Sequence, residues 1–447
     1  MGYTQMKCGL TVLQVALIGV GLAFSPGASS QPAAAAATST SPETAPETPD
    51  RISPFSPITP TGDPFGAISS SAIPLSLMPA AGGFLVGPFS VYPVLGLAQR
   101  YDDNIFLSNT NQRSSWQTIV SPGVRAEIRQ PGGNVYGVTY RADVGRFWSS
   151  SADNYQDHTV VADADVIINT QARFLVRAEY LSLHDPRGAT DRPIGAEPDE
   201  WRAPGVSGLF SYGTPGAQGR IDVSAGHQRK RYDNNRASTI GADRDNSFYG
   251  AVFYWRVTPI TSLLFEARQT DIDYKLATSL QDSTERRYYV GATWEATAKT
   301  TGIVKAGYLT KNFDSAALTD FSGTGWEARV RWSPLTYSIF ELTTQRETNE
   351  SSGIGDFILS SVVYGTWTHA WNNEVRSNAL VGYRTDDFKG AGATRKDKTA
   401  SAGAGVTYQF RRWLNLGAQY IYTDRSSNAP GMEYERNVFM LTLGATL

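Results

Sequence analysis

Cysteine is almost absent from this sequence, and so are an excess of charge and a long hydrophobic run. Cys8 is the only cysteine among 447 residues, so the fold needs no disulfide bonds. Lysine and arginine total 40 and aspartate and glutamate total 42, and this balance gives no argument for nucleic-acid binding. No stretch of about 18 or more apolar residues occurs outside the extreme N-terminus, which excludes a helical membrane protein.

Glycine and aromatic residues, by contrast, are abundant, with 42 glycines and 11% Phe, Trp and Tyr. This composition is too aromatic and too glycine-rich for a disordered or coiled-coil chain. A length of 447 residues suffices for two or three ordinary soluble domains or for one large β structure. The pattern of apolar and polar residues along the chain decides between several soluble domains and one large β structure.

Residues 1–30 are typical of a secretory signal peptide. Lys7 supplies a positive start, residues 10–24 form an apolar core, and Ala28-Ser29-Ser30 offers small residues for cleavage. An uncleaved anchor helix is the alternative, but this core is shorter than the ~20 residues that a span needs. Cys8 precedes the core, so it cannot be the lipid-modified cysteine of a lipoprotein.

Residues 31–88 are rich in Pro, Ala, Ser and Thr, with prolines at 54, 57, 60 and 64. This composition favours an extended or polyproline II conformation over a packed core. We therefore expect a disordered periplasmic linker, too short and too polar to form a globular plug.

From residue 89 to 447 the chain alternates apolar and polar side chains in segments of roughly 10 to 14 residues, which indicates strands with one face in each environment. The apolar set of one such segment is Trp326, Ala328, Val330 and Trp332, and it interleaves with Glu327, Arg329 and Arg331.

The connections between these segments alternate between short and long. The eight short ones carry turn residues, for example 131–133, 259 and 372–373, and the nine long ones include 102–114, 184–201 and 231–244. Seventeen connections join 18 strands, and short periplasmic turns with long external loops are typical of bacterial outer-membrane barrels. The sequence thus predicts an all-β, up-and-down antiparallel transmembrane β-barrel of about 18 strands.

The length of this region agrees with that count. Its 359 residues leave about 20 per strand plus connection, enough for the 9 to 11 residues of a tilted membrane-spanning strand. A propeller or a secreted solenoid is the alternative, but no blade period of about 40 to 45 residues is visible. The last strand alternates Phe439, Leu441, Leu443 and Ala445 up to Leu447, which resembles the signal recognised by the outer-membrane insertion machinery.

Several predicted strands end in an aromatic or polar residue followed by Asp or Asn, as at 101–104, 232–235 and 422–424. An aromatic girdle followed by turn residues at the water boundary explains this pattern. A calcium or lipopolysaccharide site is a sharper alternative, since carboxylates and amides are hard oxygen ligands.

The face opposite the apolar stripe carries more basic than acidic residues. We expect this face to line the lumen, because a charged side chain at the bilayer midplane costs free energy. A basic lumen that concentrates anions is one interpretation, and cross-strand ion pairs that satisfy one another are the other. The predicted lumen-lining basic residues are Arg125, Arg129, Arg141, Arg173, Arg177, Arg268, Arg287, Lys305, Arg329, Arg331, Arg376 and Arg384.

Enzymatic function has little support in the sequence. His158 beside Asp157 and His184 beside Asp185 are the candidate acid/base pairs, while His369 fits an aromatic girdle. GxSxG and HExxH motifs are both missing, so we expect no catalysis, no cofactor and no metal.

The stretch Tyr101-Asp102-Asp103-Asn104-Ile105-Phe106 follows the first predicted strand. Together with the signal peptide and the proline-rich arm, it makes residues 89–447 resemble the putative β-barrel porin-2 family, which carries such a motif at this place. The resemblance implies an outer-membrane protein associated with exopolysaccharide export, working with periplasmic polysaccharide-export proteins and an inner-membrane copolymerase. It implies no catalytic residues.

Three functional hypotheses follow for a barrel in the outer membrane of a Gram-negative bacterium, in contact with its lipid and lipopolysaccharide. The first is a channel for exopolysaccharide export. The second is a structural or adhesive surface barrel with a blocked lumen. The third is a general diffusion porin, in which the loop at 184–201 could constrict the pore.

Overall fold

The computed structural model describes residues 83–192, 194–214, 216–297, 299–351, 353–390 and 392–446. The predicted signal peptide, the linker up to residue 82 and the terminal Leu447 lie outside these ranges. Among the described residues, none of the helices is long and apolar enough to cross a membrane.

The described residues form strands almost throughout, with short helical turns in two of the loops. The helical turns are η2 (Ser151–Asp153), α2 (Arg236–Thr239) and η3 (Ile240–Ala242). The strands are β1 (Phe84–Val86), β2 (Phe89–Asp102), β3 (Ser115–Arg129), β4 (Val135–Phe147), β5 (Tyr155–Ile167), β6 (Ala172–Asp185), β7 (Asp199–Tyr212), β8 (Gly219–Tyr232), β9 (Arg244–Thr258), β10 (Thr261–Tyr274), β11 (Ser283–Thr297), β12 (Thr300–Phe313), β13 (Phe321–Leu335), β14 (Ser338–Glu350), β15 (Phe357–Ala370), β16 (Val375–Lys389), β17 (Lys396–Arg411), β18 (Leu414–Ser427) and β19 (Tyr434–Thr446).

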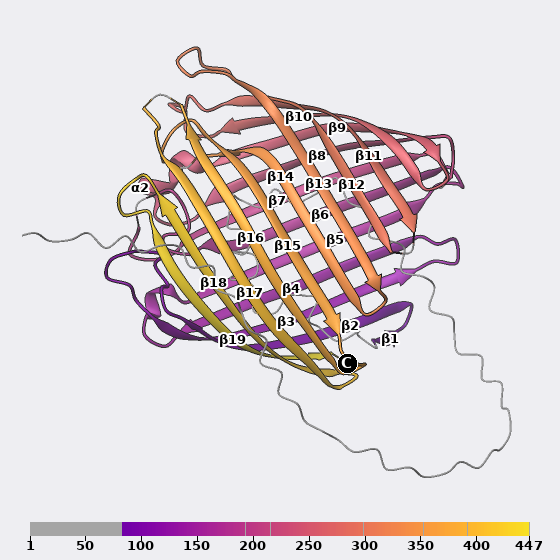
Figure 1. Ribbon diagram of the computed structural model, residues 1–447, viewed down its shortest axis with the longest axis horizontal. Coiled ribbons are helices and arrows are strands. Elements are labelled where there is room, and N and C mark those ends of the chain that lie inside the picture. Colours follow the sequence, from indigo (N-terminus) through magenta and orange to yellow (C-terminus); the bar gives the residue numbers. More distant parts are fainter. Residues whose placement is uncertain are drawn as a thin grey trace, which may run out of the picture. The chain divides into compact units, whose positions relative to one another are not determined.

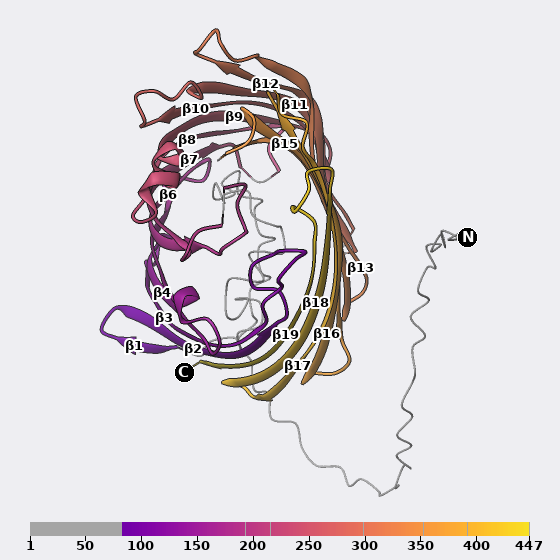
Figure 2. The same ribbon diagram turned by 90° about the vertical axis from the view of Figure 1, so that its left-hand side faces the viewer.

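Strands β2 to β19 form a closed antiparallel barrel. Each pairs with the next in the sequence, and β19 pairs with β2, so Figure 2 shows the strands as a ring. The predicted 18-stranded, up-and-down topology is confirmed. All the short connections lie at one end of the barrel and all the long loops at the other, as the diagonal strands of Figure 1 illustrate.

The extra strand β1 begins the sheet at Phe84, earlier than the predicted start at residue 89. Its partners are Phe89 to Val91 of β2, whereas β19 reaches β2 only at Val94. β1 therefore covers part of the β2 edge that β19 leaves open, and unpaired strand edges are the positions that proteins protect.

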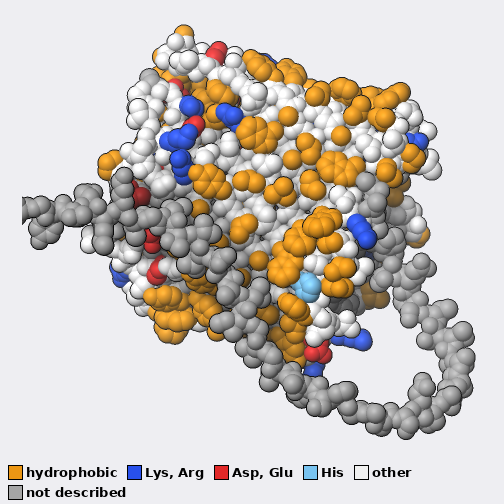
Figure 3. All heavy atoms as spheres, viewed as in Figure 1, with side chains coloured by type: hydrophobic (Ala, Val, Ile, Leu, Met, Phe, Trp, Pro, Cys, Tyr) orange, Lys and Arg blue, Asp and Glu red, His pale blue; other side chains and the backbone are white. Residues whose placement is uncertain are grey.

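The outer face of the barrel is apolar between two aromatic belts, and Figure 3 shows its apolar side chains spread over the wall. The lower belt, at the short turns, contains exposed Tyr212, Trp255, Trp332, Tyr337, Trp371, Phe410 and Trp413. The upper belt contains exposed Tyr140, Tyr180, Tyr249, Tyr288, Tyr308, Tyr383 and Tyr420. Aromatic belts of this kind mark the two interfaces of a membrane-spanning barrel.

Strands β2 to β19 are 13 to 16 residues long, longer than the 9 to 11 that a tilted span requires. The excess lies above the upper belt, because its tyrosines sit five to seven residues below the long-loop ends of their strands. There the outer face is polar, with Arg146, Gln156 and Asp245. The strands therefore continue past the apolar band toward the long loops.

The motif at 101–106 fastens the β19–β2 seam. Asp102 is 1% exposed and accepts from Arg100 at 2.8 Å and from Arg436 of β19 at 2.6 Å. The carboxylate of Asp103 accepts from the backbone and side-chain amides of Asn437, both at 2.7 Å. The motif therefore helps to close the barrel, because the Asp102 and Asp103 carboxylates accept hydrogen bonds from donors within the chain.

Asn104 completes this closure. Its buried amide donates to the backbone carbonyls of Ser108 and Glu435, both at 2.8 Å. Tyr101 points the other way and packs on Trp116, with ring centroids 5.2 Å apart, one residue from the long-loop end of β2. Among the described residues, no group of three His, Cys, Asp or Glu side chains could hold a metal, so the calcium alternative stays a prediction.

Replacing Asp102 with asparagine will weaken the seam. The change removes the carboxylate charge that both Arg100 and Arg436 bond, and breaking a buried ion pair costs about 3–5 kcal/mol. Urea unfolding of the refolded barrel in detergent, followed by heat-modifiable gel migration, measures the loss. Asp424→Asn, on the exposed outer face of β18, is the control. Equal midpoints for the two variants would contradict the closure role.

Candidate functional site: the lumen

The inner face of the barrel carries the charged side chains. Strand register places all twelve predicted basic residues on this face, alternating with the exposed apolar residues. On β13, for example, Arg329 and Arg331 share the inner side with Glu327, and Trp332 points outward. Their role in solute passage stays a prediction.

Carboxylates neutralise most of these cations. Ten of the twelve have a partner within 4.0 Å: Arg125, Arg129, Arg141, Arg173, Arg177, Arg268, Arg287, Lys305, Arg331 and Arg384. In the part of the chain whose side chains are described, Arg329 and Arg376 have no ion-pair partner, and both are exposed. The ion-pair interpretation thus describes most of the wall.

Many of these pairs join side chains two residues apart on one strand. Arg141 contacts Asp143 at 2.9 Å, and Arg384 contacts Asp386 at 2.7 Å. Alternate residues of a strand share a face, so an Arg-x-Asp or Arg-x-Glu spacing in the sequence is the signal that predicts such pairs.

Sequence reasoning missed several acids of the wall, including Glu285, Glu347, Glu350 and Asp386. Glu347 and Glu350 lie at the upper end of β14, which continues to Glu350 before β15 starts at Phe357. Because the strands extend above the apolar band, their upper ends add carboxylates that a count of membrane-spanning residues omits.

The loop between β6 and β7 (186–198) crosses the lumen. Its Asp191 carboxylate accepts from the Ser351 hydroxyl at 3.2 Å and from the Ile354 backbone amide at 3.3 Å. β14 lies eight strands from β6 in a ring of 18, so the loop contacts a hairpin that comes from a distant part of the ring. Figure 2 shows this magenta segment inside the ring. The 184–201 segment, singled out in the sequence, therefore constricts the lumen.

A buried cluster holds the base of this loop. Arg192, 5% exposed, bonds Asp199 at 2.7 Å and Asp185 at 3.3 Å, and its guanidinium lies 4.6 Å from the centre of the Tyr232 ring. Burial alone lowers the pKa of Arg192, but contact with Tyr232 and the two carboxylates outweigh it and raise the pKa above its usual value. Arg192 is therefore a permanent cation that holds the loop against β6, β7 and β8.

The same loop packs on the end of the seam motif. Arg187 pairs with Asp153, and its guanidinium lies 4.2 Å from the centre of the Phe106 ring. Gly188 has φ +79°, and a Cβ there would come within 2.1 Å of the Phe106 carbonyl oxygen. Only glycine fits at this approach.

The top of the β14–β15 hairpin also bends into the lumen. The β13–β14 ladder stops at Trp326 and Arg346, and above it Glu350 accepts from Lys311 at 2.6 Å and from Tyr274 at 2.7 Å. Lys311 and Tyr274 belong to the inner faces of β12 and β10, so the hairpin packs on the inside of those strands. It presents Ser351 and Ile354 to the crossing loop.

The histidines do not form the predicted acid/base pairs. His184 bonds Asp157 across the strands, with Nδ1 and Oδ1 2.9 Å apart, rather than Asp185. His158 contacts the Tyr140 hydroxyl at 3.0 Å. His369 lies 4.4 Å from Trp371 between ring centres, within the lower aromatic belt.

Several solved structures are similar to this chain at low sequence identity. OpdK from Pseudomonas aeruginosa with vanillate has a TM-score of 0.48 at 13% identity, covering 80% of this chain and 99% of its own. OprD from Pseudomonas aeruginosa has 0.45 at 13% identity, covering 82% and 97%. OccAB4 from Acinetobacter baumannii has 0.45 at 12% identity, covering 80% and 98%.

No curated protein matches the sequence. A family model does, over the whole of the described barrel. Since the model described as putative beta-barrel porin 2 matches residues 79–447, the chain belongs to that family.

Proposed function

We propose that this protein is a channel for small polar solutes in the outer membrane of a Gram-negative bacterium. The observation that carries the proposal is a closed 18-stranded barrel whose apolar outer face lies between two aromatic belts while its inner face is charged. Barrels of this size enclose an aqueous lumen unless something fills it. Membership of a porin family supports the same function.

The crossing loop makes small solutes the better candidates. It meets the β14–β15 hairpin inside the long-loop half of the lumen, where Asp191 accepts from Ser351, and a wide polymer has less room there than a small molecule. A general diffusion porin therefore agrees best with the lumen, and the expected contacts are with outer-membrane lipid and lipopolysaccharide. β19, with exposed Phe439 and Leu441, is the segment we expect the insertion machinery to recognise.

Charge distribution favours anions among these solutes. Arg329 and Arg376 lie on the inner face in the short-turn half, exposed and without a carboxylate partner among the described side chains. The other predicted lumen cations are held in ion pairs, which cancels most of their long-range field. Two guanidiniums without a carboxylate partner on the lumen wall raise the local concentration of anions.

Export of an exopolysaccharide is the second candidate, and its support is the family resemblance of the motif at 101–106. It needs periplasmic polysaccharide-export proteins as partners. A structural or adhesive barrel with a blocked lumen is the third, and it differs from both in conducting no ions.

Removing the crossing loop will enlarge the pore. Replacing residues 189–197 with a short Gly-Ser bridge removes Asp191 and Arg192, and with them the contact between this loop and the β14–β15 hairpin. Single-channel conductance in planar bilayers should rise at least about twofold, because an open 18-stranded lumen is wide. Heat-modifiable migration checks folding. Unchanged conductance would show that the constriction lies elsewhere. The absence of any conductance in both the unaltered protein and the loop variant would favour a blocked lumen.

Replacing both Arg329 and Arg376 with glutamine will lower the preference of the channel for anions. The reversal potential in a KCl gradient should shift toward cations, with the chloride-to-potassium permeability ratio falling on the order of twofold. Arg229→Gln, on the outer face of β8, removes the same charge outside the pore and should change nothing. An equal shift in the control would contradict the assignment.

Deleting the gene separates the first two candidates. If the barrel exports exopolysaccharide, surface polysaccharide measured by sugar analysis should fall strongly and return with the plasmid-borne gene. A diffusion porin predicts normal polysaccharide and slower uptake of small solutes. Normal polysaccharide together with a conducting protein would eliminate the export role.

A further inference from the structure

A gap opens in the barrel wall between β5 and β6 at the long-loop end. The ladder between them ends at His158 and Ser182, yet β5 pairs with β4 as far as Tyr155 and β6 pairs with β7 as far as Asp185. Above the last rung each strand therefore follows its other neighbour. A cavity of about 340 Å³ occupies the gap, and we name it the β5–β6 notch.

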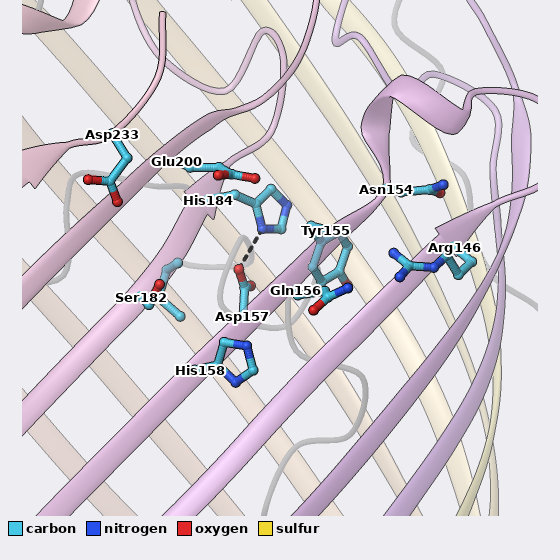
Figure 4. Close-up of a pocket in the computed structure, with 11 residues that line it drawn as sticks. Arg146, Asn154, Tyr155, Gln156, Asp157, His158, Ser182, His184, Glu200 and Asp233 are labelled. Atoms are coloured by element: carbon cyan, nitrogen blue, oxygen red, sulfur yellow. Dashed lines mark hydrogen bonds and ion pairs between the residues drawn. The ribbon is translucent and has the colours of Figure 1, made fainter. Parts of the chain in front are cut away.

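The floor of the notch is rigid and aromatic. The Tyr155 ring stacks on the His184 imidazole with centroids 4.0 Å apart, and His184 is fixed by its 2.9 Å bond to Asp157. Figure 4 shows these three side chains converging from the two strands. The His184 and Asp157 side chains are only 5% and 10% exposed, so they belong to the floor of the cavity.

The rim of the notch offers unoccupied hydrogen-bonding groups. The Glu200 carboxylate, the Gln156 amide and the Ser182 hydroxyl all line the cavity and have no hydrogen-bond partner among the described residues. Arg146 also lines it and donates only to the Gly145 carbonyl, at 3.3 Å. A ligand can therefore bond to the rim without breaking internal contacts.

The charges of the lining favour neither anions nor cations. Asp233 pairs with Arg202 at 2.6 Å and Asp157 bonds His184 at 2.9 Å, so the carboxylate of Glu200 and the guanidinium of Arg146 remain, and their charges are opposite. A metal ion is disfavoured because no group of three side chains among the described residues has the geometry to hold one. Vicinal hydroxyls, in contrast, donate to a carboxylate and both donate to and accept from amides.

The position of the notch along the barrel wall places it at the level of surface sugars. It lies above Tyr140 and Tyr180 of the upper aromatic belt, on the part of the wall that is polar outside. In the proposed outer-membrane setting this level is that of lipid headgroups and surface polysaccharide. A volume at the lower end of the range for ligand sites suits one or two sugar rings.

We propose that the β5–β6 notch binds a neutral saccharide, with Glu200 and Gln156 holding its hydroxyls and Tyr155 and His184 forming the floor. The site lies in the wall and not in the constriction, so it adds a surface-recognition function to the proposed channel and depends on that proposal only for its height in the membrane. The saccharide belongs to free glycan or to the core sugars of lipopolysaccharide.

A glycan array tests the proposal with the full-length protein, fluorescently labelled and purified in detergent. The array carries neutral, amino and acidic oligosaccharides. We expect binding to neutral glycans, weakened about tenfold by Glu200→Gln, because a hydrogen bond to a charged group is lost. Gln156→Ala is a second variant in case the first folds poorly. Glu435→Gln, another exposed strand-top carboxylate, should bind as the unaltered protein does.

Three outcomes would overturn the proposal: binding to no glycan, binding to acidic glycans only, or equal binding by Glu200→Gln and the unaltered protein. Competition then identifies the source, with a soluble neutral oligosaccharide in one arm and bicelles containing core-only lipopolysaccharide in the other. Single-channel conductance of Glu200→Gln should be unchanged, so failure of saccharide binding and failure of the channel proposal are separate results.

Discussion

Closure of the sheet between β19 and β2 is the interaction on which the rest of the structure depends. An open 18-stranded sheet has two edges, and each would present unpaired N–H and C=O groups to a medium that cannot bond them. The β19–β2 ladder removes both edges, and Asp102 reinforces it through Arg436, 334 residues away in sequence. This contact joins the first and the last strand of the barrel, so the motif at 101–106 belongs to the seam that closes the ring.

Once the ring is closed, half of the strand side chains face a confined lumen, and their charges must be compensated there. Pairs such as Arg141 with Asp143 and Arg384 with Asp386 lie two residues apart on one strand, so each strand brings much of its compensation with it. Arg329 lacks this arrangement because its neighbour Glu327 bonds Lys305 of β12 at 3.0 Å. The field of the pore therefore depends on the few cations that local pairing leaves over, not on the total number of arginines.

The strand count, the topology and the outward face were predictable because they depend on local signals. Alternation has a period of two, and turn residues such as Asn372 and Asn373 mark each reversal. The constriction was not predictable in the same way. Asp191 and Ser351 are 160 residues apart, and nothing in either segment shows that both enter the lumen. The pair of His184 with Asp157 was likewise missed, since it joins two strands where their ladder has ended.

The parts that control passage are separate from the part that closes the ring. Asp191 accepts from a serine hydroxyl and a backbone amide of the β14–β15 hairpin, whereas Arg192 is held by two carboxylates at the base of the loop. The base therefore joins opposite charges, while these two bonds at the tip join a carboxylate to uncharged donors. A sequence change at the tip can alter the width of the pore while the base and the seam keep their bonds, so members of one barrel family can differ in solute without differing in fold.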